Sequence, residues 1–90
     1  MSDESSITDL RNLGVKSESM LSDAGITTVE RLREIGAVSA YVQIVATGAE
    51  PSMNLLWALE GALTGRSWQE VAKHDRLSLL MQLEQEQAQG

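Results

Sequence analysis

A short stretch near the start of the chain, LRNLGVK at residues 10–16, combines a turn-forming glycine with two cations. Where a tight turn leads into a helix, the backbone amides at the helix start are unpaired and the helix dipole adds a positive potential. A phosphate group is the ligand that such a corner attracts. The residues positioned to contact it are Arg11, Asn12, Gly14 and Lys16.

The spacing in this stretch resembles the turn of a helix-hairpin-helix motif, which has the pattern apolar-x-Gly-apolar-Gly. Leu10, Leu13 and Gly14 match the pattern, and Asn12 replaces its first glycine. Asn tolerates left-handed backbone, so the turn is compatible with the replacement. A single such motif contacts one or two phosphates, which gives weak, salt-dependent binding. Many of these hairpins are instead structural corners or protein docking surfaces, and both interpretations stay open here.

Catalytic chemistry has little support in the sequence. The chain has one histidine, His74, and no cysteine, so it lacks the usual ligands of a zinc site. No serine is marked as a partner of His74, and the carboxylates are scattered along the chain. We therefore expect no enzymatic activity, no cofactor, no metal and no small-molecule substrate.

Trp57 and Trp68 allow two interpretations. Tryptophans can form a ligand cage or a platform on which bases stack. Both residues also lie at helical spacing among aliphatic side chains, which is typical of core packing. We favour the core and predict that it contains Leu55, Leu56, Trp57, Leu59, Leu63 and Trp68.

The elements that position these residues are predicted to be helices. The 90 residues suffice for one domain, and with only three aromatic residues the core must consist of aliphatic side chains and methionine. No stretch alternates apolar and polar residues for long enough to be a strand. The prediction is an all-α, compact bundle of five to six short helices with a helix-hairpin-helix-like N-terminal part. Residues 1–90 form a single domain, frayed at 1–5 and 85–90.

Local signals divide the chain into these helices. Glycines at 14, 25, 36 and 48 are each expected to end a helix in left-handed backbone. Capping boxes are predicted at Thr27–Glu30 and Ser67–Glu70, and Glu60 is expected to face solvent or meet Arg66. Residues 53–63 are apolar on nearly every side, which predicts the central helix of the bundle.

The charge balance limits the classes of partner. Thirteen acidic residues against seven basic ones give a net charge of −6, which disfavours DNA and anionic membranes. The N-terminus has no signal-peptide pattern, and the most apolar stretch, residues 54–63, is too short to span a bilayer. We therefore expect the partner to be another protein or a second copy of this chain in a homodimer.

Two blocks of the sequence resemble a known family. The blocks are NLGVKSESMLSDAGITTVERLREIGAVSAY, from residue 12, and NLLWALEGALTGRSWQEV, from residue 54. Together they resemble the C-terminal domain of the TfoX family, bacterial regulators of DNA transformation competence, over about residues 7–83. The second block is the more specific one.

The resemblance implies a compact helical domain, cytoplasmic and bacterial, without catalytic residues. It also implies a regulatory role in protein interaction, with weak DNA binding through the hairpin turn as the alternative. Family members carry an α/β domain ahead of this one, so the chain resembles a stand-alone C-terminal domain. Position 15 departs from the family, whose commoner residue is proline, and Val15 leaves the turn less rigid.

Overall fold

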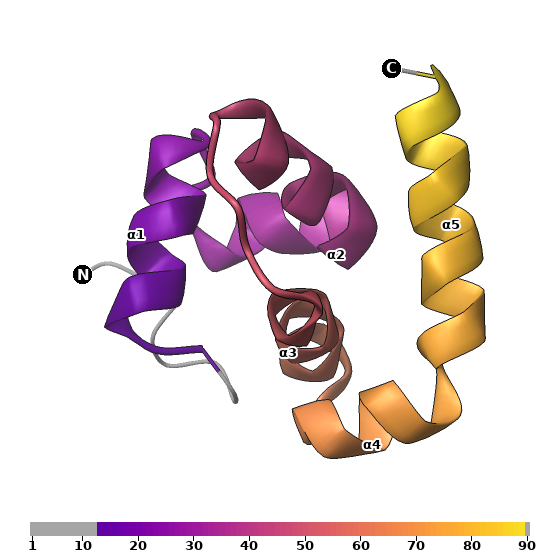
Figure 1. The fold of residues 1–90 in the computed structure, drawn as a ribbon. Helices are drawn as coiled ribbons and strands as arrows, with labels where there is room; N and C mark the ends of the chain where they lie inside the picture. The colour runs from indigo at the N-terminus through magenta and orange to yellow at the C-terminus, as the bar shows by residue number, and fades with distance from the viewer. Residues whose placement is uncertain (1–12, 90) are drawn as a thin grey trace.

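The computed structural model describes residues 13–89, and every regular element in that part of the chain is an α-helix (Figure 1). The all-α prediction is confirmed. A further helix expected before Leu13 lies outside the described residues. The five described helices are α1 (Val15–Asp23), α2 (Val29–Ala46), α3 (Met53–Thr64), α4 (Trp68–His74) and α5 (Arg76–Gln89).

Helix α2 is kinked at Gly36, where two separate helices were expected. Gly36 has φ 85° and ψ 167°, and helical backbone resumes after it. The break at Gly36 was predicted correctly. The helical segments before and after it follow one another directly, and together they form α2. The helix begins one residue later than predicted, because Thr28 rather than Thr27 is the N-cap and accepts a hydrogen bond from the Arg31 amide at 3.1 Å.

The prediction of left-handed glycines is right at 25, 36 and 48, where φ is positive, and wrong at Gly14. Gly14 has φ −118° and ψ −168°, an extended conformation that any residue adopts. The reason is its position: Gly14 is the N-cap of α1, and N-cap residues take extended backbone.

Helices α2 and α3 form the centre of the fold (Figure 1). Helix α2 contacts α1, α3 and α5, and α3 contacts both α2 and α4. Leu56 and Leu59 are fully buried, and Leu55 and Trp57 are buried as well, as predicted. Leu63 is partly buried and packs against the edge of this core.

The core assignment of Trp68 is wrong, because its side chain is 37% exposed. Trp68 is the first residue of α4, directly after Ser67, whose hydroxyl accepts a hydrogen bond from the Glu70 amide at 3.2 Å. That cap confirms the second predicted capping pair. Val71 is the residue of α4 that is buried in the core. Trp68 lies instead at the edge of the bundle.

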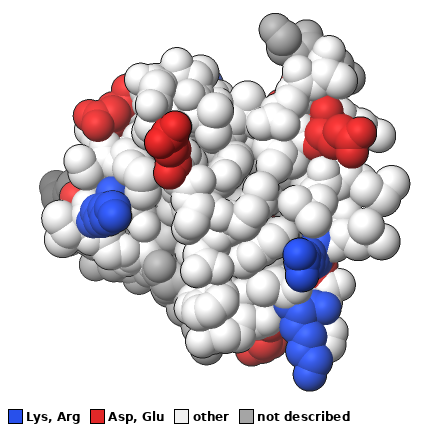
Figure 2. Space-filling model, in the orientation of Figure 1, with Lys and Arg blue, Asp and Glu red and all other residues white. Residues whose placement is uncertain are grey.

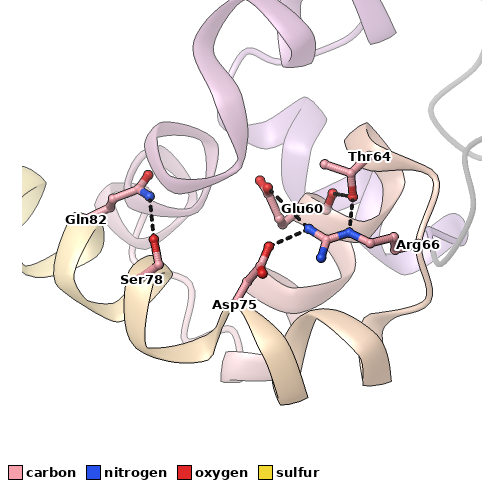
Figure 3. A network of polar contacts seen from close by, with 6 residues as sticks. All are labelled: Glu60, Thr64, Arg66, Asp75, Ser78 and Gln82. Carbon is pink, nitrogen blue, oxygen red and sulfur yellow. Dashed lines mark hydrogen bonds and ion pairs between the residues drawn. The ribbon is translucent and has the colours of Figure 1, made fainter.

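Arg66 connects the end of α3 to the junction of α4 and α5 (Figure 3). Its guanidinium forms a close ion pair with Asp75, lies 3.9 Å from Glu60, and donates from Nε to the Thr64 hydroxyl at 3.0 Å. The expected contact with Glu60 is therefore present, with Asp75 as the closer partner. The hydrogen bond from Arg66 holds the pKa of Asp75 below its ordinary value and raises the pKa of Arg66.

Helix α5 stands at one side of the molecule and continues to Gln89, where fraying had been expected from residue 85 (Figure 1). Its buried side chains Leu79 and Leu83 belong to the core, and α5 packs on α2. None of the described helices combines the length and apolar composition that crossing a bilayer requires.

Candidate functional site

A groove of about 500 Å³ opens between α1, the start of α3 and the start of α4. Met20 of α1, Leu55 and Ala58 of α3, and Pro51 supply aliphatic lining, and Trp68, the first residue of α4, lines the groove as well. The lining residues are Lys16, Ser17, Met20, Glu50, Pro51, Ser52, Asn54, Leu55, Ala58 and Trp68.

The wall formed by residues 50–52 is fixed by Tyr41. The buried Tyr41 hydroxyl donates a hydrogen bond to the Pro51 carbonyl at 3.1 Å, which ties the connection between α2 and α3 to the core. Burial raises the pKa of Tyr41, which further favours the protonated phenol that donates this bond. Ser52 is the N-cap of α3, and the helix that follows directs Leu55 and Ala58 into the groove floor.

The groove has opposite charges at its rim. Among the described residues that line it, Lys16 and Glu50 are charged, both are exposed to solvent, and their charges cancel. An apolar floor, an aromatic wall and a polar rim are the features with which proteins bind an apolar side chain of a ligand or partner. A polyanion requires several cations, and the described part of the groove lining supplies one, Lys16.

Of the four residues predicted to contact phosphate, the structure describes Gly14 and Lys16. Helix α1 begins at Val15, directly after Gly14, as the hairpin pattern requires, and the Glu18 amide donates to the Gly14 carbonyl at 3.0 Å. Lys16 is exposed in the first turn and lines the groove. Arg11 and Asn12 lie outside the described residues. Contact with phosphate by these four residues therefore stays a prediction.

The described residues contain no group of three or more His, Asp or Glu side chains that could hold a metal ion. His74 ends α4 next to Asp75 and lies away from the groove lining. Among the described residues, the pKa values of Tyr41, Arg66 and Asp75 are shifted, by burial at Tyr41 and by the ion pair at Arg66 and Asp75. Each has a structural cause.

Most of the groove was missed by the sequence analysis. Met20, Asn54 and Glu50 carry no pattern that sets them apart from neighbouring surface residues. Trp68 was noticed, but its spacing to aliphatic neighbours favoured the core. The groove arises where three elements meet, and periodicity along one element does not report such a meeting.

Comparison with known proteins identifies the family. The family model of the TfoX C-terminal domain, which describes the sequences of that family, matches residues 3–83. The chain belongs to the TfoX C-terminal domain family. This TfoX-type domain is 37% identical over 75 residues to the DNA transformation protein TfoX of Haemophilus influenzae, and 33% identical over 76 residues to TfoX1 of Aliivibrio fischeri. Each match covers 83% of the chain but only 35% and 36% of the relatives, so the chain spans about a third of their length.

Two crystal structures share the fold of this TfoX-type domain. Both are of proteins of uncharacterised function from Listeria monocytogenes. One, a triclinic form, is 31% identical with a TM-score of 0.76 and covers 83% of this chain and 85% of its own. The other, a tetragonal form, is 30% identical with a TM-score of 0.77 and covers 89% and 98%.

Proposed function

We propose that this TfoX-type domain is a non-enzymatic, regulatory interaction module that binds an apolar segment of a partner protein in the groove. The observation that carries the proposal is Trp68, which is 37% exposed and lines the groove together with the apolar residues Leu55 and Ala58. Tryptophans in such positions are enriched among the residues that dominate the free energy of protein–protein binding.

Charge supports a protein partner over a nucleic acid. The chain carries a net charge of −6, and the described residues at the groove rim include one cation, Lys16, and one anion, Glu50. A net negative field raises the free energy of bringing a polyanion close, whereas a neutral groove imposes no such cost on a peptide.

The relatives' names connect the proposal to DNA transformation. They are DNA transformation proteins about three times as long as the matched region. We infer that this domain contributes protein contacts to the regulation of competence, in the cytoplasm.

The test uses peptides selected from a random phage-displayed library on the immobilised domain, then labelled with fluorescein and titrated by anisotropy. Trp68→Ala is expected to weaken their binding about tenfold or more, as for a central interface tryptophan. Leu77→Ala is the matched control, because it removes an exposed apolar side chain from α5, outside the groove. Affinities that are unchanged in Trp68→Ala, or lowered equally by both variants, would contradict the proposal.

A weak DNA-binding module is the second candidate. It is favoured by Lys16, exposed in the first turn of α1, and by Gly14, an N-cap without a side chain to occupy the helix start. Its binding must depend on Lys16 and fall steeply with salt.

A further inference from the structure

We propose that the outward face of α5 is a self-association surface, which binds α5 of a second copy in antiparallel orientation. This surface is separate from the groove, and the proposal does not depend on what the groove binds.

Helix α5 has apolar side chains on two faces. Leu79 and Leu83 are buried in the core, whereas Leu77 is 72% exposed and Met81 is 56% exposed. Leu77 and Met81 are four residues apart, so they lie about 40° apart around the helix and form one stripe. Glu84 and Ala88, both exposed, continue this stripe toward the C-terminal end.

Two shallow, open depressions lie beside the stripe on the surface of α5. A shallow depression of about 510 Å³ runs along it, lined by His74, Leu77, Ser78, Met81, Gln82 and Gln85. A second hollow of about 250 Å³ continues it along Met81, Glu84, Gln85 and Ala88. An apolar ridge beside a hollow is the surface that ridges-into-grooves packing of two helices requires.

Charge selects a second copy in antiparallel orientation. The basic residues Lys73 and Arg76 are exposed at the junction of α4 and α5, and Glu84 is exposed toward the free end of α5. In Figure 2, basic side chains lie near this junction and acidic ones toward the end of α5, with a further acidic patch beside the basic ones at the lower edge of the view. A parallel pair would bring like charges together, whereas an antiparallel pair places each basic end against an acidic end.

One register satisfies both the apolar and the charged residues. If the two-fold axis crosses the outward face of α5 at the level of residue 79, Leu77 of each copy lies opposite Met81 of the other. Glu84 then lies just beyond the start of α5 of the second copy, near Lys73 and Arg76 at its junction with α4. A two-fold axis makes the contact twice, so the surface is complementary to itself. Glu86 takes no part, because its carboxylate accepts a hydrogen bond from the Ser39 hydroxyl of α2 at 2.9 Å.

The interface is small. Fourteen helical residues span about 21 Å, and one such helix pair buries less than the roughly 1,600 Å² of a standard interface. The dimer is therefore expected to be weak and to form at high protein concentration.

Sedimentation equilibrium from about 10 µM to 1 mM tests the association. The average mass is expected to rise from 9.8 kDa toward twice that value. Leu77→Asp should abolish the rise, and Glu84→Lys should weaken association about tenfold or more. The charge-swapped double variant Glu84→Lys with Lys73→Glu should restore it. Val15→Asp, at a side chain that is 78% exposed on α1, is the matched control and should associate like the unmodified chain.

Cysteine cross-linking tests the orientation, since the chain has no cysteine of its own. Ser78→Cys, next to the proposed axis, should give covalent dimers with a short bismaleimide. Ala88→Cys should not, because the two copies of residue 88 are about 27 Å apart along the pair. A mass of 9.8 kDa throughout, association insensitive to Leu77→Asp and Glu84→Lys, or efficient cross-linking at residue 88 would each overturn the proposal.

Discussion

At the scale of single residues, Arg66 makes the side-chain contacts that join three helices. It follows α3, pairs with Asp75 between α4 and α5, and also reaches Glu60 within α3 (Figure 3). Both side chains of the Arg66–Asp75 pair are about one-third exposed, so solvent screens their attraction. The pair is better understood as an orienting contact at the junction than as a large source of stability.

The pair makes stability depend on pH in acid. Because the pKa of Asp75 is lowered in the folded state, the unfolded chain takes up a proton at this residue near pH 4, before the folded chain does. The stabilisation is therefore complete above that pH and is lost as the pH falls through the lower, folded value. We expect the free energy of unfolding to decrease less between pH 6 and pH 3 in Asp75→Asn than in the unmodified chain, measured by urea denaturation.

Arg66→Gln provides the control for this prediction. It removes the cation and leaves the carboxyl group, so it should flatten the pH dependence in the same way. The double variant should add nothing further, since both changes remove one interaction. Equal acid sensitivity in Asp75→Asn and the unmodified chain would show that the ion pair does not persist in solution.

At the scale of elements, the kink of α2 depends on Gly36. Its φ of 85° and ψ of 167° lie in a region that is essentially restricted to glycine. Both segments of α2 contribute buried side chains to the core. Val29 and Leu32 precede the kink, and Tyr41 and Ile44 follow it. Tyr41 in turn fixes the wall of the groove through Pro51.

Gly36→Ala is expected to destabilise the fold by about 1–3 kcal/mol, as an alanine forced into this backbone region does. No atom lies within 4 Å of the added methyl group, so the cost comes from the backbone and not from a clash. Gly14→Ala is the matched comparison, since Gly14 has extended backbone and equally open space. Thermal or urea unfolding should show a clearly smaller change there, and equal losses would argue against the kink.

The sequence predicted elements better than it predicted the groove. Helix existence followed from apolar spacing, from capping residues such as Ser67 and from glycine breaks such as Gly36. The buried positions of α3 followed from its apolar composition on all sides. Trp68 was assigned to the core because spacing along a helix does not show where that helix meets the surface. Gly14 was assigned to a helix end because the same residue type also serves as an N-cap.

At the scale of the whole molecule, charge and fold point in different directions on DNA. The family and the start of α1 at Gly14 are compatible with a hairpin turn that contacts phosphate. The net charge of −6 opposes the approach of a polyanion, and Glu50 shares the groove with Lys16. One exposed lysine that neutralises a phosphate releases about one counterion from the DNA, so it adds little to the affinity for DNA.

We therefore expect no saturable binding of a labelled 20-base-pair duplex by the isolated chain at 50 mM salt and protein concentrations up to about 10 µM, measured by fluorescence anisotropy. Lys16→Ala and Glu50→Gln are the paired variants, since one removes the groove's cation and the other its anion. If the protein-binding function is correct, neither changes the anisotropy. Salt-sensitive binding that is lost in Lys16→Ala and strengthened in Glu50→Gln would instead establish the DNA-binding alternative, because local phosphate contact would then outweigh the repulsion of the whole chain.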